Sequence, residues 1–326
     1  MNRMESIKQL YRNVLGRNAD PAGLRHYMHS GSSLSDIQLH LSQSQEFKDK
    51  FKITKYPTEA LDNTIPIFII NLPRRIDRKQ QISQRLDLMK INNYAFVEAV
   101  DGSTLQNETS SEYYNKEKAI NIKRNLLPNE IACSLSHLKI MQQMVNNNIK
   151  HAIIMEDDCI PTAYLHEFLK HFDPLKNNLD LLFLGYWSSN QWRNGKPKLK
   201  TDVPVICREL LSVVYLKHAH LQVGDVGIHK AHYPSLTLDY VSGSHCVMYS
   251  LEMAKRILQI NYPVFTEADN VWNFLPESDL QFAYPLCSFT EFFDSDLDST
   301  RPSSDQHIEL FSDSFKKRVS HPDFGT

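Results

Sequence analysis

The stretch Ile153-Ile154-Met155-Glu156-Asp157-Asp158 joins an apolar run to three consecutive carboxylates. A short apolar run bounded by polar residues is typical of a buried strand in a parallel sheet. Because ligands of open α/β sheets bind at the carboxyl ends of strands, these acids are expected at a ligand site. Adjacent acids repel one another unless a cation or hydrogen-bond donors offset their charge. The stretch therefore predicts a divalent metal that holds a phosphorylated substrate. The alternative is a solvated loop tip, or a cap for the helix predicted after Pro161.

Length and composition describe a globular chain with a sizeable core. Its 326 residues, 41% hydrophobic and 23% charged, are enough for one large domain or two unequal ones. A net charge of -2 argues against a nucleic-acid partner, which requires a basic surface. No stretch approaches the roughly 20 apolar residues that span a bilayer, and the N-terminus lacks an apolar signal core.

The cysteine pattern argues against a disulfide framework and against a zinc site. The five cysteines are scattered and form no CxxC pair. This usage favours a reducing compartment and predicts a cytoplasmic protein. The cysteines are Cys133, Cys159, Cys207, Cys246 and Cys287.

The pattern of residues 1–52 predicts a small all-α domain. Residues 53–64 are expected to form a linker to the rest of the chain. Leu10, Tyr11, Val14 and Leu15 recur at helical spacing. Residues 16–23 read as a turn and residues 24–29 as a second helix, and a third helix is expected with Ser35 as its N-cap. The segments 10–17, 20–27 and 44–47 resemble domain of unknown function 4214. That resemblance implies a module that binds a protein partner, or a helical extension that packs on the main domain.

From residue 65 onward, strands alternate with helices. Strands are predicted at 65–72 and 94–100, helices at 79–89 and 128–146, and a further strand ends in the three acids. This alternation predicts an α/β fold with a doubly wound, mostly parallel sheet.

A basic cluster follows the first predicted strand. Arg74, Arg75 and Arg78 carry guanidinium forks, which suit phosphate. These arginines and the acidic loop could bind a nucleotide diphosphate from two sides, the arginines directly and the acids through a metal. The alternative is that the arginines lie at the solvated start of a helix and pair with Asp77. His137 lies on an apolar helix, where a histidine is more often a core residue than a catalyst.

The order of these motifs resembles glycosyltransferase family 25, which contains bacterial lipooligosaccharide galactosyltransferases and animal procollagen galactosyltransferases. The motifs lie at residues 69–78, 99–102, 129–137 and 154–158, and the likeness continues at 243–250, 282–285 and 295–297. Pro263 and Asp269 resemble a further motif of the family, although their spacing is longer. The resemblance implies a GT-A (Rossmann-like) catalytic domain over residues 65–326. It also implies a UDP-sugar donor, usually UDP-galactose, a divalent metal (Mn²⁺ or Mg²⁺) and inversion at the anomeric carbon.

The resemblance also assigns roles to individual residues. Asp158 would bind the metal, Glu156 the metal or the ribose, and Asp296 a distal metal or the diphosphate unless it is only a surface residue. The donor would contact Asn71, Leu72, Arg74, Arg75, Arg78, Ala99, Val100, Asp101, Ser136, His137, Glu156 and Asp157. An inverting reaction needs a base for the acceptor hydroxyl. Asp269 is the first candidate and His245 the second, while Glu267 and Asp239 remain open.

Taken together, the sequence predicts a metal-dependent transferase that moves a hexose, expected to be galactose, to a glycan acceptor such as lipopolysaccharide, lipooligosaccharide or a glycoprotein. The alternatives are a non-catalytic glycan- or partner-binding protein on a degenerate fold, and a metal-dependent phosphohydrolase. Tyr186 and its aromatic neighbours are expected to stack on sugars or to anchor a loop. The basic end at residues 316–318, near Phe311 and Phe315, could touch anionic lipid at the inner face of the membrane or form a solvated helix.

Overall fold

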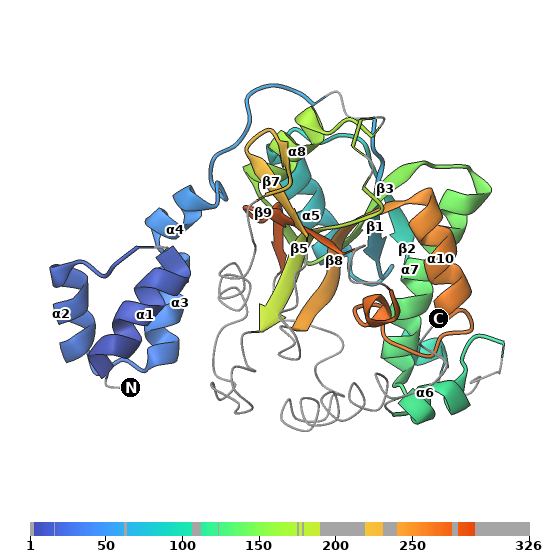
Figure 1. Cartoon of the computed structure of the whole chain (residues 1–326), viewed down its shortest axis with the longest axis horizontal. Coiled ribbons are helices and arrows are strands. Elements are labelled where there is room, and N and C mark those ends of the chain that lie inside the picture. The colour runs from blue at the N-terminus through green and yellow to red at the C-terminus, as the bar shows by residue number, and fades with distance from the viewer. Residues whose placement is uncertain are drawn as a thin grey trace.

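The computed structural model describes residues 3–15, 17–61, 64–105, 112–122, 124–174, 176–177, 179–189, 219–230, 240–275 and 280–290. Asp239, Asp296 and the basic end at 316–318 lie outside these residues. Figure 1 shows an N-terminal group of helices beside an α/β body. No helix in the described residues is both long and apolar enough to cross a membrane.

The N-terminal group consists of α1 (Arg3–Leu15), α2 (Pro21–His29), α3 (Leu34–Gln43) and α4 (Gln45–Lys50). Helix α2 begins earlier than predicted, because the Asp20 carboxylate caps it by accepting from the Gly23 amide at 2.7 Å. The prediction of Ser35 as the cap of α3 is wrong. Ser33 caps this helix, because Asp36 three residues later completes a capping box with it.

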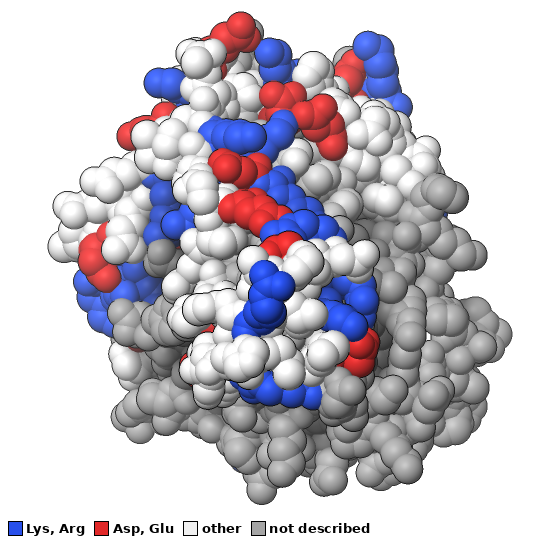
Figure 2. Space-filling model, turned by 90° about the vertical axis from the view of Figure 1, so that its left-hand side faces the viewer, with Lys and Arg blue, Asp and Glu red and all other residues white. Residues whose placement is uncertain are grey.

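Aromatic side chains pack these helices onto the body. Phe47 of α4 and Phe51 lie with their ring centroids 6.2 and 5.5 Å from that of Phe289, and all three rings are buried. Lys52 adds an ion pair to Asp225 at 2.7 Å. On the side of the molecule where the N-terminal helices lie, basic and acidic side chains intermingle among the described residues (Figure 2). The contact is therefore a hydrophobic core with a charged rim.

The body is built on an eight-stranded sheet of order β2-β1-β3-β8-β5-β9-β7-β6. Strand β1 is parallel to both β2 and β3, whereas β8 runs antiparallel between β3 and β5. The predicted α/β class with a mostly parallel sheet is confirmed, with β8 and β7 as the reversed strands. A separate two-stranded sheet pairs β4 (Cys159–Pro161) with β10 (Ser288–Thr290). The bounds of the large sheet are β1 (Ile67–Asn71), β2 (Tyr94–Glu98), β3 (His151–Glu156), β5 (Leu181–Ser189), β6 (Leu221–Val223), β7 (Val226–Lys230), β8 (Tyr240–Ser250) and β9 (Gln281–Tyr284).

Helices cover both faces of this sheet. Helices α7 (Pro128–Asn146) and α10 (Leu251–Asn261) pack on the face that carries Ile154, and α5 (Ile76–Leu88) and α8 (Ala163–His171) pack on the face that carries Met155. Because successive side chains of a strand point to opposite faces, adjacent residues of β3 serve different cores. Short helices η1 (Gly102–Leu105), α6 (Lys116–Ile122) and η3 (Val271–Phe274) complete the described elements.

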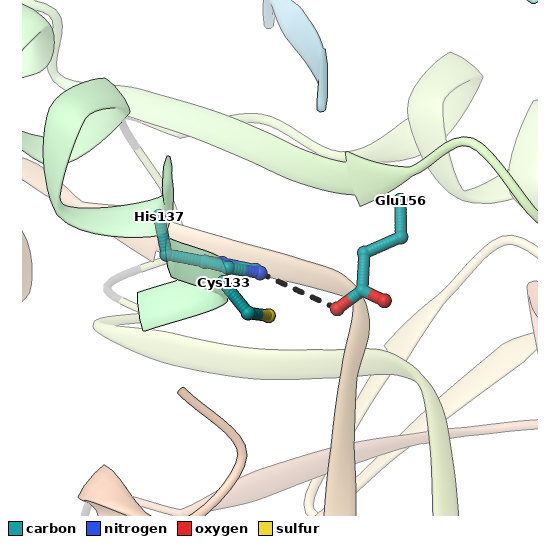
Figure 3. A group of neighbouring side chains, drawn as sticks. All are labelled: Cys133, His137 and Glu156. Atoms are coloured by element: carbon teal, nitrogen blue, oxygen red, sulfur yellow. Dashed lines mark hydrogen bonds and ion pairs between the residues drawn. The ribbon is translucent and has the colours of Figure 1, made fainter. Parts of the chain in front are cut away.

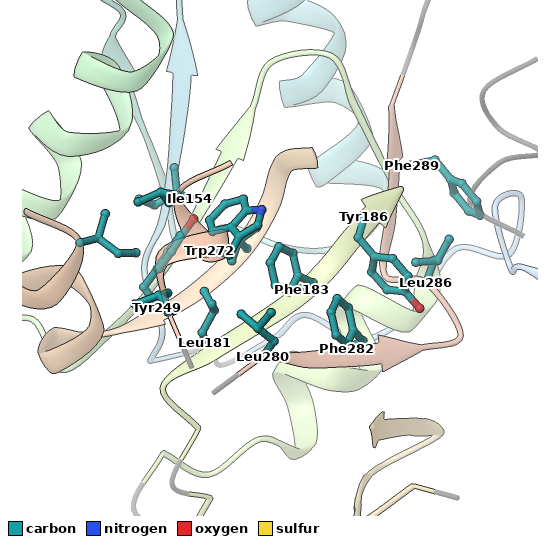
Figure 4. Packing of buried hydrophobic residues seen from close by; sticks show 14 of the residues in the cluster. Ile154, Leu181, Phe183, Tyr186, Tyr249, Trp272, Leu280, Phe282, Leu286 and Phe289 are labelled. Carbon is teal, nitrogen blue, oxygen red and sulfur yellow. The ribbon is translucent and has the colours of Figure 1, made fainter. Parts of the chain in front are cut away.

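Aromatic residues fill the core on the α7 face, as Figure 4 shows around β5. Phe183 stacks on Phe282 at 4.9 Å and meets Trp272 edge-on at 5.0 Å. Tyr186 is buried against the same Phe282 ring at 5.0 Å. Tyr186 therefore belongs to the core within strand β5, so it neither anchors a loop nor offers its face to a sugar.

Candidate active site

The candidate site lies at the carboxyl ends of the parallel strands β1 and β3, beside the antiparallel strand β8. Ile70 of β1 pairs with Glu156, so both parallel strands end at this level. Met155 pairs with Cys246 on the antiparallel neighbour β8, so β8 passes the same level at Ser244 and His245. The fold therefore gathers polar residues from the end of β1, the end of β3 and the middle of β8.

Glu156 points to the α7 side of the sheet, where Figure 3 shows it facing His137 and Cys133. Its Oε1 lies 3.3 Å from His137 Nε2 and accepts a 2.7 Å hydrogen bond from the Ser244 hydroxyl. Burial opposes ionisation of Glu156, but the hydrogen bond and charge of His137, together with Ser244, outweigh burial and lower its pKa to about 2. Glu156 is therefore a carboxylate at neutral pH.

Asp157 is bound on the α5 side instead. Its Oδ2 accepts a 2.7 Å hydrogen bond from the Asn71 amide, and its Oδ1 pairs with Arg78 at 3.2 Å. The residue is only 8% exposed, and burial raises its pKa in spite of both partners. With both oxygens held by protein groups, Asp157 ties the end of β3 to β1 and α5.

Asp158 differs from its two neighbours because one of its carboxylate oxygens lacks a partner. Oδ1 is buried and receives no hydrogen bond. Burial is the largest cause that raises the pKa of Asp158 well above its usual range, and the negative charges of Glu156 and Asp157 raise it further. A cation would relieve both the repulsion and the missing contact, and carboxylate oxygens are ligands that Mg²⁺ and Mn²⁺ prefer. The residues present therefore fit a hard divalent ion bound by Asp158 with Glu156 beside it.

The three arginines pair with three different carboxylates. Arg78 binds Asp157 directly, Arg75 pairs with Asp77 at 2.9 Å, and Arg74 pairs with Asp101. Leu72 lies in the same loop, where its carbonyl accepts from the Arg75 amide at 2.8 Å.

The loop after β2 is fixed against both β1 and α7. The Ala99 amide donates to the Asn71 carbonyl at 3.0 Å, and the Val100 amide donates to the Ser136 hydroxyl at 2.9 Å. Hydrogen bonds from Ser103 lower the pKa of Asp101, with Arg74 contributing in the same direction. These hydrogen bonds bring predicted donor residues from the end of β1, the loop after β2 and α7 next to one another.

Two base candidates are strongly constrained by their surroundings. His245 is buried, and burial lowers its pKa to about 4, so the ring is neutral at neutral pH. It fills space that only glycine at position 185 leaves free, since a Cβ there would collide with the His245 ring. Glu267 is buried in an ion pair with Arg124 at 3.0 Å, and Asn270 donates to it at 2.9 Å.

Asp269, the first candidate, lies partly exposed in the loop that follows α10. A hydrogen bond of 3.1 Å from the Ser134 hydroxyl to the Thr266 carbonyl fastens this loop to α7, one turn before His137. Sequence reasoning assigned no role to Ser244 or Cys133. Ser244 lies within the motif at residues 243–250, and Cys133 lies one helical turn before His137, so helical spacing is the signal that links Cys133 to the site.

Comparison with known families now identifies the chain. The family model of "Glycosyltransferase family 25 (LPS biosynthesis protein)" matches residues 64–272, well over half of the sequence. The chain belongs to glycosyltransferase family 25. A second model, domain of unknown function 4214, matches residues 3–51.

Relatives of this family 25 chain include animal proteins. "Procollagen galactosyltransferase 2" of Homo sapiens is 27% identical over 255 residues, which covers 74% of this chain and 34% of the relative. "Procollagen galactosyltransferase 1-A" of Xenopus laevis is 32% identical over 127 residues, 36% of this chain and 21% of the relative. "Probable inactive glycosyltransferase 25 family member 3" of Bos taurus is 27% identical over 131 residues, again 36% of this chain and 21% of the relative. The matches span about a third or less of the relatives' length.

Proposed function

We propose that this protein is a metal-dependent, inverting glycosyltransferase that transfers galactose from UDP-galactose to a glycan acceptor of a lipopolysaccharide, lipooligosaccharide or glycoprotein. The observation that carries the proposal is Oδ1 of Asp158, which is buried and has no hydrogen-bond partner. Asp158 follows two further acids directly after β3, in a chain that belongs to family 25. Such a carboxylate is costly to bury unless a cation compensates it.

The residues around Asp158 suit the demands of such a transfer. The leaving diphosphate gains negative charge, and Mn²⁺ held by Asp158 and Glu156 would supply a Lewis acid for it. Glu156 stays charged because His137 and Ser244 hold it. Asp157 keeps the end of β3 in place through Asn71 and Arg78. In this proposal, the loop residues Ala99, Val100 and Asp101 after β2 contact the nucleoside of the donor.

The acceptor hydroxyl must lose a proton as it attacks the anomeric carbon, and Asp269 is our proposed base. Glu267 is already bound by Arg124, and the imidazole of His245 is too weakly basic where it lies, because burial disfavours its charged form. Asp269 is partly exposed and sits in a loop fastened to α7, the helix that carries His137.

The test combines turnover with metal binding. With UDP-galactose and Mn²⁺ we expect turnover that chelation removes, and a metal-induced rise in melting temperature of the full chain. Asp158→Asn should lower turnover at least tenfold, on the order expected for disturbing a metal centre, and abolish the melting-temperature shift. Exposed Asp87→Asn serves as the matched control and should preserve both. Full turnover in Asp158→Asn would overturn the assignment of this residue.

A non-catalytic, glycan- or partner-binding protein is the second candidate, and the relative named as inactive is the observation that favours it. A panel of nucleotide sugars, each with and without Mn²⁺, separates the two. Binding without turnover of any sugar in the panel would support the second candidate, whereas turnover of one sugar identifies the donor.

A further inference from the structure

Three side chains of different chemistry converge behind the acidic triplet. Cys133 and His137 lie four residues apart on α7, and Glu156 reaches them from the end of β3 (Figure 3). One ligand atom from each, a thiol sulfur, an imidazole nitrogen and a carboxylate oxygen, lies within 4.8 Å of the other two. Residues four apart on a helix share one face, so α7 presents its two ligands side by side.

This donor set differs from that of Asp158. Zn²⁺ and related borderline-soft ions take thiolate, imidazole and carboxylate in tetrahedral sites with bonds of about 2.0–2.3 Å, which places ligand atoms about 3.3–3.8 Å apart. His137 Nε2 and Glu156 Oε1 are already 3.3 Å apart. Small side-chain rotations that draw in the Cys133 sulfur would complete the arrangement.

Burial also suits a metal with one open position. His137 is only 3% exposed, so its ring is held in place, whereas Cys133 and Glu156 are partly open to solvent. An ion can therefore enter from the side of Glu156, and a fourth ligand from solvent can complete its coordination. The absence of a CxxC pair excludes a site built from cysteine pairs, but it does not exclude one that mixes a single thiol with two other ligand types.

We propose that Cys133, His137 and Glu156 form a second metal site, which binds Zn²⁺ or a similar thiophilic divalent ion. When the metal binds, the thiol of Cys133 loses its proton to solvent and the resulting thiolate becomes a ligand of the metal. The site shares Glu156 with the donor region, so a bound Zn²⁺ removes this carboxylate from its role there. Zn²⁺ binding by these three side chains does not require the transferase reaction.

Titration of the metal-free full chain with Co²⁺ tests the proposal directly. A cobalt ion bound by a thiolate gives an intense sulfur-to-metal charge-transfer absorption that oxygen and nitrogen ligands do not produce. We expect this band to appear at one equivalent of Co²⁺, to vanish on addition of Zn²⁺, and to be absent in Cys133→Ser. Zn²⁺ affinity in that variant should fall at least about tenfold, the lower end of the loss seen when even the outer partners of a metal ligand are removed.

Cys287→Ser is the matched control and should retain the band, since Cys287 lies in the core on the α5 face of the sheet, away from the ligand set. His137→Gln should weaken Zn²⁺ binding while thermal unfolding reports whether the variant is folded. No thiolate band in the wild type, or an unchanged band in Cys133→Ser, would overturn the proposal. Its success or failure is independent of turnover: a chain that binds Zn²⁺ through Cys133 but transfers no sugar would contradict the proposed function alone.

Discussion

Asn71 and Asp157 join the ends of β1 and β3 by a buried 2.7 Å hydrogen bond. Arg78, at the start of α5, forms an ion pair with the other carboxylate oxygen of Asp157. Asn71 also donates to the Arg75 carbonyl at 3.1 Å, so one amide organises both the basic loop and the acidic one. Both oxygens of the middle acid of the triplet are thereby bound by protein groups, whereas Oδ1 of Asp158 receives no hydrogen bond.

Loss of the Asn71 amide should destabilise the protein. Asn71→Ala leaves one buried oxygen of Asp157 without a donor, which costs about 1–3 kcal/mol. Urea unfolding measures this as a decrease in the free energy of unfolding. Exposed Asn146→Ala is the matched control and should stay within about 0.5 kcal/mol of the wild type. Equal stability of the two variants would contradict the structural role of Asn71.

The sequence predicted the sheet and the position of the acids, because apolar runs and their polar ends are local features. It could not separate the three acids. Alternating side-chain direction sends Glu156 to α7 and Asp157 to α5, and the helix that covers each face is a property of the fold. The pairing of Arg74 with Asp101 was equally hidden, because these residues meet only when β1 and β2 lie in parallel.

Two acids of one loop should respond differently to loss of charge. Asp269→Asn should reduce kcat by about 10²–10⁴-fold with little change in stability, because a partly exposed general base is lost. Glu267→Gln should leave kcat nearly unchanged and reduce stability by about 1–3 kcal/mol, because it weakens the buried contacts of Glu267 with Arg124 and Asn270 while Arg124 keeps its 2.7 Å ion pair with Glu130. Initial rates and urea unfolding of both variants check this. The reverse pattern would move the base assignment from Asp269 to Glu267.

The buried imidazole of His245 should make the fold sensitive to mild acid. Its folded-state pKa of about 4 lies below the ordinary value of 6.5, so the folded state binds fewer protons than the unfolded state between these values. Stability must therefore fall as the pH drops from 6.5 toward 4, and the loss through this residue between pH 7 and pH 5 is about 2 kcal/mol. Urea unfolding of the wild type at the two pH values measures the total change.

His245→Gln should reduce that pH dependence by about the same 2 kcal/mol, even if the variant is less stable at both pH values. Exposed His29→Gln is the control and should retain the pH dependence of the wild type. An undiminished loss of stability at pH 5 in His245→Gln would show that other groups cause it.

The contact of Phe289 with Phe47 and Phe51 should decide whether the N-terminal helices stay on the body. Phe289→Ala removes a buried ring from this junction, at a cost of about 3–5 kcal/mol to the packing around it. Because α1 packs against α2, α3 and α4 and its residues Ile7 and Val14 are buried, we expect the N-terminal helices to detach as a unit before the body unfolds. Limited proteolysis should then cleave the described part of the linker, residues 53–61, faster than in the wild type. Tyr56→Ala, which changes an exposed ring in the same linker, should leave the cleavage rate unchanged. Equal protection of the linker in both variants would show that other contacts hold the helices in place.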